Sequence, residues 1–152
     1  MVETYTPECD FNEKAHDFEL KNVDDKFYRL DELVGAKATL IMFICNHCPY
    51  VKSILEQLVV EASVLQKKGV ACIAINSNDY EQYPEDSFEN MQKISKKYGF
   101  SFPYLIDDSQ AIAREYQAVC TPDFFGYNSE LELLYRGRFD DRKTSKQMSA
   151  NS

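Results

Sequence analysis

Two cysteines, Cys45 and Cys48, have the type and spacing in this sequence that best support chemistry. A Cys-X-X-Cys pair can alternate between dithiol and disulfide, because one thiolate attacks a disulfide and the second cysteine resolves the mixed disulfide. We assign the attack to Cys45 and the resolution to Cys48. His47 lies between them, where an imidazolium or a ring N–H would stabilise the thiolate and favour the reduced pair. The spacing therefore predicts thiol–disulfide exchange.

The segments on either side of the pair strengthen this interpretation. Residues 39–44 are apolar on both faces, which is typical of a central strand. Helical spacing follows in Val51, Ile54, Leu55, Leu58, Val59, Ala62 and Leu65. Cys45 is thus expected at a helix amino terminus, where unpaired amides and the helix dipole favour a thiolate. The alternative, two inert structural thiols, fits this context poorly.

The other three cysteines have different expected roles. Cys72 lies in the apolar run 70–75, so we expect a small buried side chain, and Cys9 lies in a polar segment as an incidental surface thiol. Cys120 is a candidate third thiol that could complete a thiophilic metal site with Cys45 and Cys48. Two thiols alone hold zinc poorly, so we expect no metal and no cofactor beyond the redox-active pair.

Composition and charge exclude several classes of protein. The chain has 152 residues, enough for one core, and its net charge of −8 disfavours a nucleic-acid surface. The longest apolar run, 38–45, is too short to span a bilayer, and residues 1–18 show no signal peptide pattern. Five cysteines cannot all pair within one chain, which favours a reducing compartment. We expect a cytoplasmic protein with no membrane partner.

Apolar periodicity and turn residues predict the order of the elements. The unit spanning 39–75 is a strand, a helix and a strand, so parallel pairing with a right-handed crossover is expected. The acidic residues Glu81, Glu85, Asp86 and Glu89 surround a helix start and are predicted to form a solvated cap. The predicted elements are a hairpin in 18–30, a helical turn in 31–35, a strand at 39–44, a helix over 51–65 that stops at 67–69, a strand at 70–75, a helix over 88–98 that ends at Gly99, a strand at 103–106, a helix capped by Ser109 that carries Ile112, Ala113 and Tyr116, and a hairpin of 124–127 with 131–135.

Several strings in the expected order resemble one family. They are Ala-His-Asp-Phe at 15–18, CNHCPYVK at 45–52, INSND at 75–79, CTPDFF at 120–125 and Arg-Gly-Arg-Phe-Asp-Asp at 136–141. The chain resembles the thioredoxin-like AhpC/TSA redoxins, and within them the CNHCPYVK-type subgroup. The resemblance implies a thioredoxin-like α/β fold with three α/β/α layers, a mixed central sheet and an N-terminal β-hairpin extension. We expect this redoxin domain to occupy 1–140, followed by a polar, disordered tail at 141–152.

The resemblance also implies further site residues. Thr121-Pro122 would be the cis-proline turn facing the cysteine pair, in which Pro122 shapes the site and Thr121 offers backbone groups to a bound peptide. Asn46, which lies between the two cysteines in sequence, is assigned to substrate binding together with Thr121 and Pro122. Cys120 would lie near the Cys45 sulfur, unless it is a buried structural thiol.

The same resemblance sets the expected function and its alternatives. Residues 40–44 lack the Pro-X-X-X-Thr-X-X-Cys pattern of peroxiredoxins, and 44–48 differ from the Trp-Cys-Gly-Pro-Cys of thioredoxins. We therefore predict a thiol–disulfide oxidoreductase or antioxidant protein whose partners are protein or small-molecule thiols and disulfides. A thiol peroxidase acting on peroxides and a metal-binding module are the alternatives. Relatives continue into a final helix that this sequence lacks, so we expect one sheet face to be under-covered unless a homodimer partner or residues missing from this sequence cover it.

Overall fold

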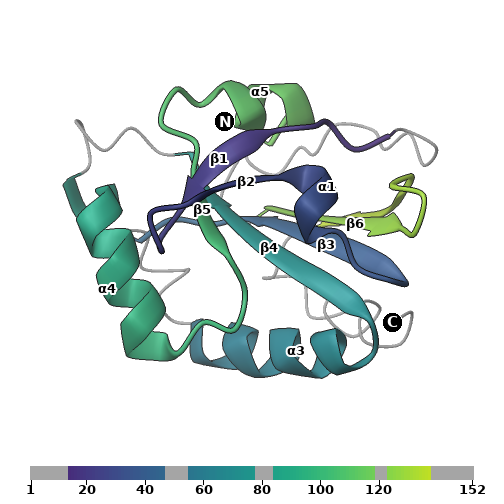
Figure 1. Cartoon of the computed structure of the whole chain (residues 1–152), viewed down its shortest axis with the longest axis horizontal. Helices are drawn as coiled ribbons and strands as arrows, with labels where there is room; N and C mark the ends of the chain where they lie inside the picture. Colours follow the sequence, from purple (N-terminus) through teal and green to yellow (C-terminus); the bar gives the residue numbers. More distant parts are fainter. Residues whose placement is uncertain (1–13, 47–54, 78–83, 119–122, 138–152) are drawn as a thin grey trace.

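A seven-stranded mixed sheet forms the centre of the protein, as the computed structural model shows for residues 14–46, 55–77, 84–118 and 123–137 (Figure 1). The strand order across the sheet is β2-β1-β5-β4-β3-β6-β7. The elements are β1 (Glu19–Asn22), β2 (Phe27–Arg29), α1 (Leu30–Leu33), β3 (Ala38–Phe43), α3 (Leu55–Lys67), β4 (Val70–Asn76), the 3-10 turn η1 (Pro84–Asp86), α4 (Phe88–Tyr98), β5 (Tyr104–Ile106), α5 (Ala111–Tyr116), β6 (Asp123–Asn128) and β7 (Leu133–Gly137).

The centre of the sheet is parallel and buried on both faces. β3 pairs in parallel with β4 from Ala38 opposite Val70 to Phe43 opposite Ile75, and β4 pairs in parallel with β5. β6 runs antiparallel to β3 on its other side. The apolar run predicted as a central strand is confirmed, because residues alternating along β3 enter two separate core clusters.

Helices cover both faces of this sheet. Leu55, Leu58, Ala62 and Leu65 of α3 and Met91 of α4 pack into one core cluster. Tyr116 of α5 and Leu30 of α1 pack into the other cluster. Figure 1 shows α3 along one side of the strands and α5 on the opposite side. The mixed α/β fold with flanking helices is therefore as predicted.

The ends of α4 are specified by local side chains and backbone. The Ser87 hydroxyl accepts a hydrogen bond from the Asn90 backbone N–H at 3.2 Å, which satisfies a free amide of the first turn. Gly99 follows the last residue with a left-handed φ of 66°, a conformation that glycine adopts without a Cβ penalty. The predicted helix over 88–98 and its stop at Gly99 are confirmed.

The start of α5 differs from the prediction. Gln110, with a left-handed backbone, takes the capping position that was expected for Ser109. The Ser109 hydroxyl accepts a hydrogen bond from the Ala111 N–H at 3.3 Å. A buried carboxylate, Asp107, accepts from the Ala113 N–H at 3.0 Å. The Ser109 hydroxyl and the Asp107 side chain therefore each satisfy one backbone amide at the start of α5, so the expected acceptor role of Ser109 is confirmed although it lies one residue before the capping position.

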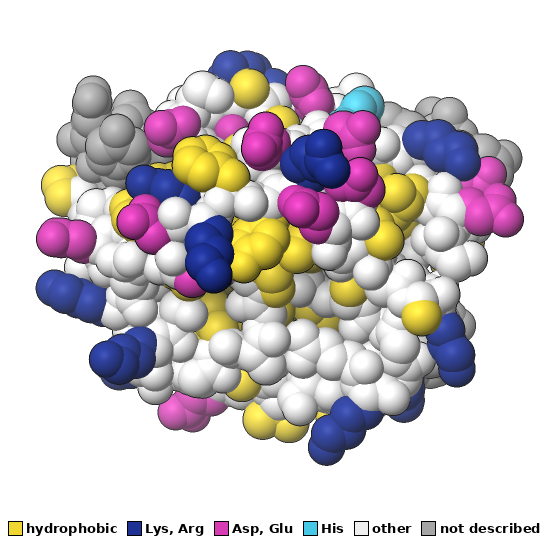
Figure 2. Space-filling model, in the orientation of Figure 1, with side chains coloured by type: hydrophobic (Ala, Val, Ile, Leu, Met, Phe, Trp, Pro, Cys, Tyr) yellow, Lys and Arg dark blue, Asp and Glu magenta, His cyan; other side chains and the backbone are white. Residues whose placement is uncertain are grey.

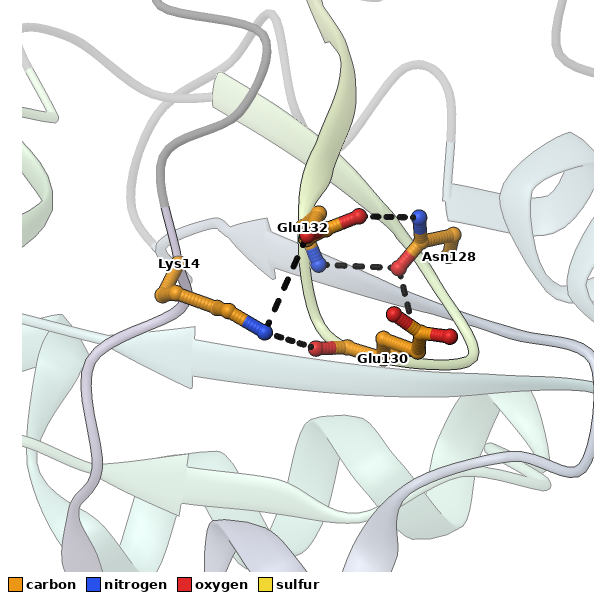
Figure 3. Close-up of polar contacts among 4 residues, drawn as sticks. All are labelled: Lys14, Asn128, Glu130 and Glu132. Atoms are coloured by element: carbon orange, nitrogen blue, oxygen red, sulfur yellow. Dashed lines mark hydrogen bonds and ion pairs between the residues drawn. The ribbon is translucent and has the colours of Figure 1, made fainter.

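The closing hairpin is held by one amide side chain (Figure 3). Asn128 Oδ1 accepts from the backbone N–H groups of Glu130 and Glu132, each at 2.9 Å. Lys14 Nζ donates to the Glu130 carbonyl at 3.0 Å and lies 3.9 Å from the Glu132 carboxylate. The turn between β6 and β7 is therefore tied to the chain that enters β1.

The surface mixes charged and apolar side chains. Figure 2 shows lysines over α4 and apolar side chains between charged ones near β1 and β2. Within the described ranges, no helix has both the length and the apolar character needed to cross a membrane. The predicted tail at 141–152 lies outside the described residues, as does the end of the predicted domain at 140.

Gly35 gives a direct test of packing in this fold. A Cβ at this position would meet backbone atoms of Ala38, Ala71 and Gly69, the latter two at 2.5 and 2.9 Å, and backbone cannot move aside as a side chain can. We predict that Gly35→Ala lowers the unfolding free energy by about 1–3 kcal/mol. Denaturant unfolding followed by circular dichroism measures this change.

Gly99→Ala is the comparison variant. An added Cβ there meets nothing within 4 Å, so only the left-handed backbone opposes it. Its expected cost is about 1 kcal/mol. A loss for Gly35→Ala no larger than the loss for Gly99→Ala would contradict the packing argument.

Candidate functional site

Cys45 lies just beyond the carboxyl end of the central strand. β3 ends at Phe43, and the Ile44 N–H still donates to the Ile75 carbonyl at 3.0 Å, which carries the parallel pairing one residue further. Cys45 is only 1% exposed and packs in the core cluster that includes Leu55 and Met91. The thiol is therefore held by the sheet and by one helical layer.

The residue after Cys45 is fixed by a carboxylate from a distant segment. Asp86 Oδ1 accepts a hydrogen bond from the Asn46 backbone N–H at 2.5 Å. The Asn46 side-chain amide donates to the Glu85 carbonyl at 2.9 Å. Asn46 and Asp86 are both buried, so these bonds replace water that neither group can reach. η1 thus determines the path of the chain immediately after the thiol.

Two more buried side chains complete this polar network. Asn76, the last residue of β4, donates from Nδ2 to Asp86 Oδ1 at 3.0 Å and to the Tyr104 hydroxyl at 3.2 Å. That hydroxyl donates to Asn46 Oδ1 at 2.8 Å. We call Asn46, Asn76, Asp86 and Tyr104 the buried polar network.

The pKa of the Tyr104 phenol is shifted by its surroundings in this network. Burial raises the pKa of the Tyr104 phenol well above its usual value, and electrostatic interactions with Asp86 and Cys45 act in the same direction. The hydrogen bond from Asn76 acts in the opposite direction. Tyr104 is therefore a neutral hydroxyl that can both donate and accept.

The prediction for the acidic cluster was wrong at Asp86, and Glu81 lies outside the described residues. Glu85 and Glu89 are exposed, as expected for a solvated cap, but Asp86 is buried. The 3-10 turn directs this carboxylate toward donors on Asn46 and Asn76. Sequence reasoning missed Asp86, Asn76 and Tyr104 as parts of the site. The signal that could have indicated Asn76 is its place at the carboxyl end of β4, beside the end of β3.

A buried ion pair lies across the neighbouring strands. Arg136 on β7 contacts Asp123 at the start of β6, with Nη2 and Oδ2 3.0 Å apart and both side chains almost fully buried. Arg136 also donates to the Gln117 carbonyl at 2.6 Å, and its guanidinium lies 4.5 Å from the centre of the Phe125 ring. Because Asp123 pairs opposite Phe43, this ion pair lies beside the end of β3.

Several predicted site residues cannot be placed. Asn46 is described, and its side chain is buried within the polar network. Among the described residues, no group of three or more His, Cys, Asp or Glu side chains could hold a metal ion. The remaining site and thiol predictions concern His47, Cys48, Cys120, Thr121, Pro122 and Cys9, which all lie outside the described residues.

Comparison with known proteins supplies the family context. The model of the AhpC/TSA family matches residues 11–139. A search of the curated proteins found no match. The structure is similar to an uncharacterized conserved protein from Geobacillus kaustophilus, with 48% identity, a TM-score of 0.85 and coverage of 89% of this chain and 72% of that one.

Two further structures extend the comparison. A hypothetical protein from Sinorhizobium meliloti is 42% identical, has a TM-score of 0.84 and is matched over 88% of this chain and 73% of that one. The thioredoxin domain of a thiol-disulfide oxidoreductase from Bacteroides vulgatus has 14% identity, a TM-score of 0.75 and coverage of 95% and 99%. The last likeness shows the fold alone, and that fold is thioredoxin-like.

Cys72 provides the internal contrast to Cys45. It lies within β4 and is buried, as predicted, and burial raises the pKa of its thiol to about 12. A thiolate is the reactive form, so Cys72 should stay unlabelled by iodoacetamide in the native protein at about pH 8. Peptide mass spectrometry after labelling measures this, with protein labelled in denaturant as the control. Native labelling of Cys72 as fast as in the denatured protein would contradict the prediction.

The Arg136–Asp123 pair predicts a large effect on stability. Arg136→Met leaves the Asp123 carboxylate buried without its cation, and we expect a loss of about 3–5 kcal/mol in the unfolding free energy. Arg29→Met is the matched control, since the Arg29–Asp31 pair is exposed and contributes little. Chemical denaturation of both variants measures the difference. Similar small losses in the two variants would contradict the assigned role of the buried pair.

Proposed function

Because this chain belongs to the AhpC/TSA family, we propose that it is a thiol–disulfide oxidoreductase with Cys45 as its nucleophile and Cys48 as its resolving cysteine. Membership of this family makes the chain an oxidoreductase that acts on thiol, disulfide or peroxide groups. The choice of thiol–disulfide exchange, the cysteine pair and the order of attack are our proposal. The assignment of this chain to the CNHCPYVK-type subgroup of the family stays a prediction.

The position of Cys45 is the observation that carries the proposal. Cys45 follows the central strand, and its neighbour Asn46 is held by a carboxylate and by a tyrosine hydroxyl. Cys72, by contrast, lies inside a strand, where burial raises the pKa of its thiol to about 12. Both thiols are buried, so the difference between them is position along the chain rather than exposure. Of the described cysteines, Cys45 is the one that lies beyond the end of its strand, where the next residue is held by hydrogen bonds from two other segments.

The proposed reaction proceeds in two exchanges. The Cys45 thiolate attacks one sulfur of a substrate disulfide, forming a new S–S bond and releasing the other substrate sulfur, which takes up a proton. Cys48 then loses its proton and attacks the Cys45 sulfur, which releases the second substrate thiol. The substrate disulfide gains two electrons and the Cys45–Cys48 pair loses two. A cellular thiol returns the pair to the dithiol form, and with a more reducing substrate the sequence runs in reverse.

The substrate contacts belong to the same proposal. Thr121 and Pro122 are proposed to receive the substrate backbone beside Cys45, and His47 to stabilise its thiolate. Asn46 contributes differently, since its side-chain contacts with Glu85 and Tyr104 hold the turn after the nucleophile. No bound cofactor is needed, because both electrons reside in the cysteine pair.

Substitution of the two cysteines tests the proposal. We predict that Cys45→Ser abolishes reduction of a protein disulfide such as that of insulin, since a hydroxyl cannot replace the attacking sulfur. Cys48→Ser should retain the first exchange and accumulate a mixed disulfide on Cys45, which non-reducing mass spectrometry detects. Cys72→Ser is the matched control and should keep the native rate, because Cys72 does not form a thiolate at neutral pH.

Two outcomes would change the proposed role of Cys45 or the proposed reaction. Native insulin reduction by Cys45→Ser would remove Cys45 as the nucleophile. Peroxide consumption by the unmodified protein far faster than by a free thiol, combined with slow insulin reduction, would favour the peroxidase alternative. In that case Cys45 would be oxidised to a sulfenic acid and Cys48 would condense with it. Stopped-flow mixing with hydrogen peroxide measures that rate.

A further inference from the structure

Tyr104 is a buried tyrosine whose hydroxyl reaches the turn after Cys45 and which the two exchange steps do not use. Its side chain is the largest of those that are fully buried, and it packs in the same core cluster as Cys45. A phenylalanine would fill this space without a polar atom, whereas a hydroxyl in a core costs free energy unless it is hydrogen-bonded. The Tyr104 hydroxyl has such partners, and they lie beside the proposed nucleophile.

The two hydrogen bonds of the Tyr104 hydroxyl have a defined direction. Asn76 Nδ2 donates to Tyr104 Oη at 3.2 Å, so Oη is the acceptor in that contact. The phenolic proton is then available to Asn46 Oδ1, which lies 2.8 Å from Oη. Burial raises the pKa of the phenol well above its usual value, so this proton is retained. Because an amide oxygen can only accept, Asn46 needs a donor here that a phenylalanine at position 104 would not supply.

The backbone of Tyr104 is held by the hairpin at the edge of the sheet. Its N–H donates to Asn22 Oδ1 at 2.8 Å, and its carbonyl accepts from the Val23 N–H at 3.1 Å. Asn22 is the last residue of β1, and Val23 begins the turn to β2. The Val23 carbonyl in turn accepts from Gln92 Nε2 of α4 at 2.8 Å. The Tyr104 hydroxyl therefore contacts Asn46 from a backbone that two other elements hold in place.

We propose that Tyr104 is a positioning residue for the exchange reaction, whose hydroxyl fixes the Asn46 side chain and thereby the turn that directs the Cys45 sulfur. This inference rests on the proposed function, because it concerns the same nucleophile. Asn46 Nδ2 donates to the Glu85 carbonyl at 2.9 Å, so both polar ends of the Asn46 side chain are bonded within the protein. Asn46 then acts by holding the chain, and a looser turn would bring the sulfur into line with a substrate disulfide less often.

The test is single-turnover reduction of insulin by the full chain in its reduced form, over a range of insulin concentrations. Tyr104→Phe removes the hydroxyl and keeps the ring. We expect the limiting rate at saturating insulin to fall about tenfold, because the direction of attack is affected. The insulin concentration that gives half of this rate should change by less than about twofold, because binding is not affected. An unchanged limiting rate, or a loss confined to the half-saturating concentration, would overturn the proposal.

Tyr116→Phe is the matched control. Tyr116 is also a buried tyrosine, but it belongs to the other core cluster, and its hydroxyl donates to the His16 carbonyl at 2.5 Å. Loss of this hydroxyl should weaken the fold in a comparable way and leave the limiting rate of insulin reduction unchanged. A merely structural role for Tyr104 would give the two variants the same limiting rate, and that result would refute the inference.

A double substitution shows whether Tyr104 acts through Asn46. Asn46→Ala removes the acceptor of the phenolic proton and should lower the limiting rate by itself. Adding Tyr104→Phe to this variant should then cost little more, because the bond is already lost, whereas independent effects would multiply and contradict the proposal. If Tyr104→Phe does not fold, a native limiting rate in Asn46→Ala alone is sufficient to reject it. Insulin reduction by Cys45→Ser is scored separately, so failure of the proposed function is distinguished from failure of this inference.

Discussion

The hydrogen bond from the Asn46 amide to the Asp86 carboxylate is the interaction on which the arrangement of the site depends. It joins the end of the central strand to a turn 40 residues away, and both partners are buried. A buried amide or carboxylate without a partner costs free energy that folding cannot easily offset. The contact therefore restricts both segments at once. The turn after Cys45 and the 3-10 turn before α4 must form together.

The parallel pairing of β3 and β4 brings the residues around this hydrogen bond close together. β3 and β4 end side by side, which brings Asn46 and Asn76 to the same region of the protein. The Tyr104 hydroxyl on β5 donates to Asn46, while the Tyr104 backbone N–H donates to Asn22 Oδ1 at 2.8 Å. Polar residues from four segments are thus satisfied by one another rather than by water. Such a network restricts the motion of its members, which would keep the proposed nucleophile Cys45 in a fixed direction.

Cys45 and Cys72 show how position differentiates residues of one type. Both are buried, and their strands are adjacent in the sheet. Cys72 lies within its strand, and loss of hydration raises the pKa of its thiol to about 12. Cys45 lies where the strand has ended and the chain turns among polar side chains. These two cysteines therefore have different surroundings, because one lies within its strand and the other lies just beyond the end of its strand.

Much of the architecture was determined by the sequence itself. The apolar run of β3, the capping serine of α4 and the left-handed Gly99 are local features, because neighbouring residues alone satisfy the backbone there. The cysteine spacing likewise predicted the type of chemistry. Only the tertiary structure decided the role of Asp86, which reads in sequence as one more acid at a helix start. Its burial depends on donors from Asn46 and Asn76, and contacts between residues so distant in sequence leave no periodic signal in the chain.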